Sequence, residues 1–158
     1  MLYRDADFRN RSQVEIQSGG TLMWSEIVCA GRIARGEAFE FRRYDNRLAI
    51  RYDGVLVFCN QTSWQPLKDN LRTIGSWESS THYGQIVFVS ESITASHLGA
   101  VREVLAQFPN LRSGASLANR AGLVVTFLGR SAWEMQALVE QVRLCLTNQN
   151  LALMSSGT

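Results

Sequence analysis

The densest group of side chains able to do chemistry lies between Gly31 and Phe39, which read Gly-Arg-Ile-Ala-Arg-Gly-Glu-Ala-Phe. Arginine presents a rigid fork of donors that matches a carboxylate, and glycine permits sharp bends and close backbone approach. Because an unpaired buried charge is costly, we expect each arginine here to have a carboxylate or backbone-carbonyl partner. The pattern predicts an internal Arg–Glu network at a corner between strands, or a protein-contact surface, and the two can coexist. The residues concerned are Gly31, Arg32, Arg35, Gly36, Glu37 and Phe39.

Three cysteines, Cys29, Cys59 and Cys145, offer thiol chemistry without a recognised spacing. Their number is odd and they form no CxxC pair, which argues against a disulfide framework and against a structural zinc site. Each is flanked by apolar residues, so we expect all three to be buried free thiols. A cysteine nucleophile needs an accessible, electropositive setting, and nothing in the spacing singles one out.

The two histidines, His82 and His97, are well separated in the sequence. We expect His82 to lie in a loop and His97 to be a surface residue near the start of a helix. Two distant histidines without a cysteine cluster do not predict a compact metal cage. The weak candidates for a metal contact are His82, Cys59 and Glu37.

Motifs of common enzyme classes are absent from the sequence. There is no GxxxxGK[ST] loop, no GxGxxG after a strand and no GxSxG elbow. We therefore expect a protein that is not an enzyme. Two alternatives stay open: a small β-rich enzyme that uses Cys59 or His82, and a binding or structural module without metal.

Composition indicates a globular chain with a real core. Of 158 residues, 46% are hydrophobic and 19% are charged, and the net charge is +2. The longest basic cluster, Arg42-Arg43, is too short for a nucleic-acid or lipid footprint. No apolar run approaches the roughly 20 residues that span a bilayer, and the N-terminus lacks an apolar signal core. These features predict a cytoplasmic protein with no membrane or nucleic-acid partner.

The first half of the chain reads as a series of strands. Alternation or β-branched content predicts strands near residues 14–16, 21–30, 37–42, 48–52 and 55–58. Residues 44–47 look like a hairpin loop, and Asp53-Gly54 is a strong type I′ turn signal. Residues 61–84 read as a connecting loop with short strand pieces.

The last third changes character. A strand at 85–89 precedes a helix that Thr94 caps and Pro109-Asn110 ends. Strands at 112–118 and 123–128 are joined across residues 119–122. Ser131 and Glu134 form a capping box for a second helix, and the tail from residue 148 is expected to fray. We predict one domain, 1–158, with a β-rich portion (1–84), a β-α-β-β-α portion (85–147) and a tail (148–158).

The segment from Gly31 to Phe39 resembles the GRxARGExF signature of the urease accessory protein D family (UreD, called UreH in some bacteria). The resemblance continues through flanking segments on both sides and into residues 122–129 and the helix that follows. It covers most of this chain but only the C-terminal part of the family, roughly its last half to two-thirds. The family's ending with Pro-Arg and Trp is absent here.

This resemblance implies a mainly β fold, β-helix-like or built of stacked antiparallel strands, with two α-helices packed near the C-terminus. It also implies a cytoplasmic scaffold that binds the accessory proteins UreF and UreG and the urease apoenzyme. The family performs no chemistry of its own and passes nickel along an internal route, so nickel would be transient cargo and no cofactor would be tightly bound. In this interpretation Arg32, Arg35 and Glu37 shape the core or the lining of the route.

Overall fold

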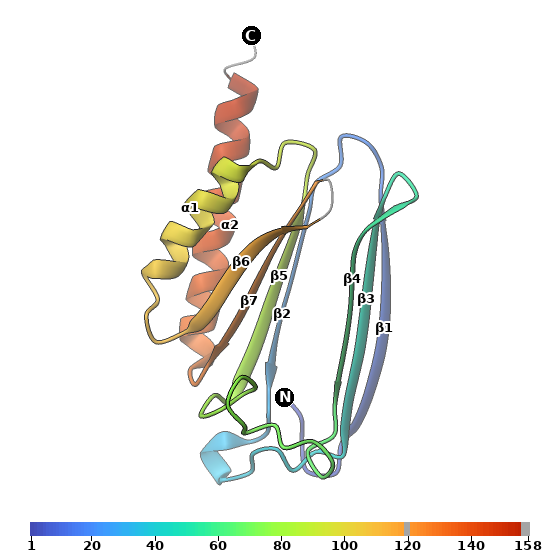
Figure 1. The fold of residues 1–158 in the computed structure, drawn as a ribbon, viewed down its shortest axis with the longest axis vertical. Coiled ribbons are helices and arrows are strands. Elements are labelled where there is room, and N and C mark those ends of the chain that lie inside the picture. The colour runs from blue at the N-terminus through green and yellow to red at the C-terminus, as the bar shows by residue number, and fades with distance from the viewer. Residues whose placement is uncertain (119–120, 156–158) are drawn as a thin grey trace.

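Two β-sheets face each other, and two helices cover the outer side of one of them (Figure 1). The computed structural model describes residues 1–118 and 121–155. One sheet has the order β1-β3-β4, with β1 (Asp7–Ile16), β3 (Arg43–Tyr52) and β4 (Val55–Trp64). The other has the order β2-β5-β7-β6, with β2 (Leu22–Cys29), β5 (His82–Val89), β7 (Gly122–Gly129) and β6 (Arg112–Ala118). The helices are α1 (Ala95–Ala106) and α2 (Ala132–Ser155). The predicted mainly β class with two helices is confirmed.

The chain path combines coiled and antiparallel pairing. After β1 the chain crosses to the four-stranded sheet as β2 and returns as β3, which pairs with β1 in parallel. Such a return resembles one coil of a β-helix. The remaining pairs, β2 with β5, β3 with β4, β5 with β7 and β6 with β7, are antiparallel. Both forms of stacking named in the prediction therefore occur in one molecule.

Two predicted elements between β2 and β4 are wrong. Residues 37–42 are irregular and not a strand, because Phe39 has a positive φ of 61° and its N–H donates to the Ala30 carbonyl. The predicted hairpin loop at 44–47 lies inside β3. There Tyr44 and Asn46 point inward between the sheets, so polar residues continue the alternation of the strand.

The Asp53-Gly54 turn is predicted correctly, but the connecting loop predicted at residues 61–84 is too long. Asp53 and Gly54 have φ values of +47° and +73°, as a type I′ hairpin requires. β4 extends to Trp64 and β5 begins at His82, so the connecting loop is 65–81. His82 therefore lies in a strand and not in a loop.

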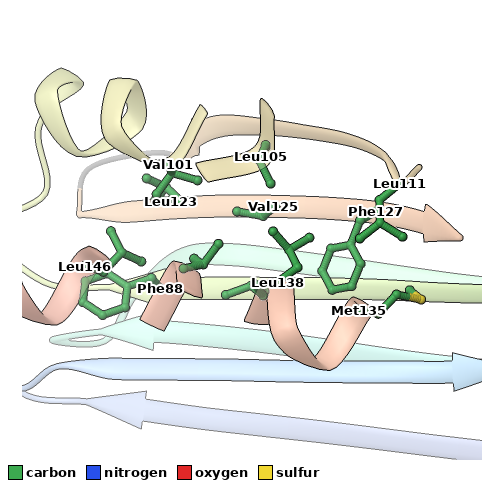
Figure 2. Packing of buried hydrophobic residues seen from close by; sticks show 12 residues of the cluster. Phe88, Val101, Leu105, Leu111, Leu123, Val125, Phe127, Met135, Leu138 and Leu146 are labelled. Atoms are coloured by element: carbon green, nitrogen blue, oxygen red, sulfur yellow. The ribbon is translucent and has the colours of Figure 1, made fainter. Parts of the chain in front are cut away.

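The core between the four-stranded sheet and the helices is built mainly of apolar side chains (Figure 2). β5 supplies Ile86 and Phe88, and β7 supplies Leu123, Val125 and Phe127. Helices α1 and α2 pack against these strands with the buried side chains Val101, Leu105, Met135, Leu138, Val142 and Leu146. Two smaller clusters fill the space between the sheets, one around Ile50 and Val87 and one around Phe41 and Trp77.

Both helices begin at the predicted caps. Thr94 and His97 form a capping box, in which the Thr94 N–H donates to His97 Nδ1 over 3.2 Å. His97 was expected at the surface, but this arrangement leaves it only 2% exposed. At α2 the Glu134 N–H donates to Ser131 Oγ over 3.4 Å, while the Glu134 carboxylate accepts from Asn110.

α2 continues past residue 148, where the sequence predicted fraying. No glycine or proline interrupts the segment before Gly157, so nothing in the sequence ends the helix there. Residues 156–158 lie outside the described part of the chain, as do residues 119 and 120 of the β6–β7 connection. None of the described helices is long and apolar enough to cross a membrane.

Substituting Thr94 by alanine tests the cap of α1. Loss of the side-chain oxygen removes one partner of the orphan N–H groups, so we expect the free energy of unfolding to fall by about 1 kcal/mol. Ser96→Ala, at an exposed position in the first turn, is the control and should change it by less than about 0.5 kcal/mol. Urea unfolding measures both, and equal stabilities of the two variants would contradict the capping role.

Candidate functional site

The segment Gly31–Phe39 forms a corner that leaves β2 and turns back toward β3. Residues Ile33–Arg35 make one turn of 3-10 helix, which Gly36 ends in the left-handed conformation with φ +74°. The Gly36 N–H donates to the Ile33 carbonyl over 3.0 Å. The Phe39 N–H donates to the Ala30 carbonyl over 2.8 Å and closes the loop.

Gly31 sits where two backbone stretches of this corner nearly touch. A Cβ atom added at Gly31 would lie 2.2 Å from the Glu37 carbonyl oxygen, far inside van der Waals contact. The φ of Gly31, +155°, is also a value that side chains disfavour. Only glycine fits this position, which explains the first glycine of the motif.

Glu37 ties the corner to the N-terminal segment. Its Oε2 accepts from Arg32 Nε at 2.9 Å and from Arg32 Nη2 at 2.5 Å, and its Oε1 accepts from the Arg4 backbone N–H at 2.7 Å. The residue is only 4% exposed. The hydrogen bonds from Arg32 are the main reason that the pKa of the Glu37 carboxyl is lowered. Arg32 thus has the expected carboxylate partner, while an interaction role of the motif stays a prediction.

Arg35 does not follow the expectation. It is exposed at the end of the 3-10 turn, and it has no ion pair or hydrogen bond to its side chain within residues 1–118 and 121–155. The turn directs Arg35 to solvent because Gly36 reverses the chain immediately after it. Of the two arginines in the motif, Arg32 therefore pairs with Glu37 within the corner, whereas the Arg35 side chain is exposed to solvent.

The cysteines and His82 do not form the sites considered for them. Cys59 is exposed on the three-stranded sheet, and Cys29 and Cys145 are partly buried, so the expectation of three buried thiols is wrong. His82 is buried at the start of β5, opposite Cys29, and its Nδ1 lies 2.9 Å from the Thr81 hydroxyl. Burial lowers the pKa of His82, which favours the neutral ring.

The weak metal candidates His82, Cys59 and Glu37 lie on separate elements of the fold. Cys59 belongs to β4 and His82 to β5, in different sheets, and Glu37 belongs to the corner. The described residues contain no group of three His, Cys, Asp or Glu side chains that could hold a metal ion. No pairing of Cys59 with His82 supports the alternative of a small enzyme.

A band of polar side chains crosses the space between the sheets, and the sequence alone did not reveal it. Asn46 Nδ2 donates to Glu26 Oε2 over 2.9 Å, and Asn10 Nδ2 donates to Asn46 Oδ1 over 2.9 Å. Asn60 Nδ2 donates to Gln85 Oε1 over 3.3 Å. The first and last of these bonds join one sheet to the other. We call this set, from five strands, the polar layer: Asn10, Glu26, Asn46, Asn60 and Gln85.

Aromatic rings connect the polar layer to the motif. Phe39 packs edge-on against Trp77 with ring centroids 5.2 Å apart, and Trp77 contacts Trp64 at 4.9 Å. Trp64 in turn stacks on Tyr44 at 4.8 Å and meets Tyr83 at 5.2 Å. Burial raises the pKa of both tyrosines, that of Tyr83 to about 12, so both are neutral phenols at physiological pH.

Glu26 is the ionisable member of the polar layer. Burial raises the pKa of its carboxyl, and the hydrogen bonds from Asn46 and Tyr44 only partly oppose this effect. A carboxylate in this position destabilises the fold when it is ionised. Such a residue marks a candidate functional position, because structure alone would favour a neutral side chain there.

Glu26→Gln tests this cost. A folded-state pKa above the unfolded value means that stability falls as pH rises from the unfolded pKa through the folded one. At pH 7 the glutamine variant should therefore melt higher than the parent by roughly 2 to 4 °C, and the difference should shrink below about pH 4.5. Glu103→Gln, at an exposed position of α1, should show no such pH-dependent difference. Melting curves across pH would contradict the interpretation if both variants behaved alike.

The sequence is similar to known proteins of one family. A family model described as UreD urease accessory protein matches residues 1–156. The chain is 28% identical over 141 residues to the urease accessory protein UreD of Acetivibrio thermocellus, covering 89% of this chain and 54% of that protein. It is 28% identical over 154 residues to the UreD of Actinobacillus pleuropneumoniae, covering 95% and 57%. The chain belongs to the UreD urease accessory protein family and spans slightly more than half the length of these curated relatives.

Proposed function

We propose that this chain is a non-catalytic scaffold in the assembly of the urease nickel centre. The family match over residues 1–156 is the observation that carries this proposal. Its partners would be the urease apoenzyme and the accessory proteins UreF and UreG, in the cytoplasm. The placement of Arg35 supports a contact role, because an exposed arginine without an internal partner suits a protein interface.

Nickel would be transient cargo of this scaffold and not a resident cofactor. The carboxylate, amide and phenol oxygens of the polar layer and of the adjacent tyrosines would hold nickel only weakly, as transit requires, because this ion prefers imidazole nitrogen. Glu26 supplies the negative charge among them. Its position between the sheets, where it accepts a hydrogen bond from Asn46 of the opposite sheet, supports a role in passing the cation.

Co-expression with the urease subunits and the remaining accessory proteins tests both parts. We expect Arg35→Glu to abolish co-purification with at least one accessory protein or urease, because charge reversal at an interface repels an acidic partner surface. We expect Glu26→Gln to preserve co-purification and to lower the nickel content of the purified urease. Arg130→Glu, at an exposed arginine after β7, is the matched control and should change neither quantity.

The outcomes separate the alternatives. A parent chain that co-purifies with no urease component would overturn the scaffold function. Normal co-purification with unchanged urease nickel in the Glu26→Gln variant would retain the scaffold and remove the cargo route. If the parent chain binds urease components, but deleting the chain leaves the nickel content of urease unchanged, the structural module without metal is favoured.

A further inference from the structure

The outer face of the three-stranded sheet holds two arginines directly opposite each other. Arg11 of β1 is the Cα partner of Arg47 of β3, and both residues are exposed. Neither side chain forms an ion pair or a hydrogen bond with another residue that the structure describes. Like charges opposite each other destabilise a sheet. Asp45, two positions before Arg47 on the same face of β3, is the neighbouring carboxylate, and it forms no ion pair with either arginine. The pair therefore weakens the sheet, and an external anion would relieve the repulsion.

A hollow lies beside this pair. Ala49 follows Arg47 by two positions and precedes Arg51 by two, and its small side chain leaves a space of about 460 Å³. The carboxylate in the lining of this hollow is Glu15, the Cα partner of Arg51, and it accepts from the Gly54 N–H over 2.7 Å at the hairpin turn. Arg51 Nη1 donates to the Gly54 carbonyl over 2.9 Å, so Glu15 and Arg51 each hold one backbone group of the hairpin turn. We call Arg11, Arg47 and Arg51 the arginine face.

The arginine face is open to solvent. Figure 1 shows both helices on the far side of the four-stranded sheet, and no other described element covers β1, β3 and β4 from outside. Cys59 of β4, the Cα partner of Ala49, lines the same hollow and is exposed. This thiol provides a reporter for anything that binds there.

We propose that the arginine face binds an acidic segment of another polypeptide chain in extended conformation. Guanidinium groups match carboxylates with paired hydrogen bonds, so acidic side chains suit this face. Arg47 and Arg51 lie four residues apart on one face of β3, about 13 Å along the strand. An extended segment repeats its side chains on one face at the same spacing, whereas residues four apart on a helix are separated by only about 6 Å. This surface would exist whether or not the chain takes part in urease assembly.

A labelled decapeptide of alternating Thr and Glu is the probe, and fluorescence anisotropy on the full chain is the measurement. We expect saturable binding that weakens as salt rises, and slower maleimide labelling of Cys59, followed by mass spectrometry, in the presence of the peptide. The alternating Thr-Lys decapeptide should not bind.

Variants locate the binding. Arg47→Thr removes the repulsion with Arg11, so the variant should remain folded and at least as stable as the parent while it binds the peptide roughly tenfold more weakly. Arg130→Glu, on the other sheet, should bind like the parent. Equal affinity of the Arg47→Thr variant and the parent would overturn the site.

Competing occupants give different results. A concentration-dependent dimer whose formation Arg47→Thr abolishes, without peptide binding, would replace the acidic segment by a second copy of this chain. Displacement of the peptide by an equal concentration of inorganic phosphate would reduce the site to a simple anion site. Absence of peptide binding in a monomeric protein would leave the arginines as charges that only keep the sheet soluble, and the proposal would be wrong.

Discussion

Gly31→Ala is expected to destabilise the protein by roughly 3 kcal/mol. The new methyl group would lie 2.2 Å from the Glu37 carbonyl oxygen and 3.0 Å from its carbon, and both atoms belong to backbone. A backbone clash is relieved only when the corner opens. Opening it would also move the Glu37 carboxylate away from Arg32. The free energy of unfolding in urea is the measurement.

Gly99→Ala is the matched control for this substitution. Gly99 lies in α1, and a Cβ atom there meets nothing within 4 Å. The alanine should stabilise the protein by about 0.5 to 1 kcal/mol, because glycine loses more conformational entropy in a helix. Opposite signs for the two glycines would show that the close approach at the corner causes the loss. A neutral Gly31→Ala variant would mean that the corner is not held as described.

Glu37→Ala is expected to lower the melting temperature at pH 7 by roughly 10 °C. The carboxylate is the acceptor of three hydrogen bonds, two from the Arg32 side chain and one from the Arg4 backbone. Its loss leaves the part-buried Arg4 N–H and the half-exposed Arg32 guanidinium without their carboxylate acceptor. Glu40→Ala is the control, because Glu40 pairs with Arg4 at the surface and its removal should cost less than about 2 °C.

The pH dependence of the Glu37 contribution has a definite sign. A folded-state pKa below the unfolded value gives stability that is present above the unfolded pKa and lost as pH falls through the folded one. The difference in melting temperature between the parent and Glu37→Gln should therefore be largest near neutral pH and diminish in acid. The ionised Glu26 carboxylate destabilises the fold, which is the opposite effect. At neutral pH the Glu26→Gln variant should therefore melt higher than the parent, and this increase should also diminish in acid. A Glu37→Gln difference that grew in acid would contradict the described carboxylate pairing.

The sequence predicted best those elements whose apolar residues repeat regularly. The helix stripes, the Asp53-Gly54 turn and the caps at Thr94 and Ser131 depend on neighbours within a few positions. Residues 37–42 are the exception to this regularity. Their alternation is typical of a strand, but the positive φ of Phe39 and the tertiary bonds of Glu37 override it. These contacts reach from nine positions, for Phe39 with Ala30, to thirty-three positions, for Glu37 with Arg4.

The candidate site was predictable only where its members are adjacent in sequence. Arg32 and Glu37 are five positions apart, so their pairing could be expected from the motif. Glu26 and Asn46 are twenty apart and lie in different sheets, and their pairing depends on a register that no local pattern specifies. One signal was present. Glu26 stands between Trp24 and Val28 at an inward strand position, where a polar residue needs a partner.

The parallel pairing of β1 with β3 has a consequence for how the protein folds. The hairpins β3–β4 and β6–β7 join neighbouring strands, so they can form from short stretches of chain. β1 pairs with residues thirty-six positions further on, and the intervening β2 must first dock on the opposite sheet. Closing such a loop costs entropy before any contact repays it. We therefore expect β1 to join the native structure later than the hairpins β3–β4 and β6–β7.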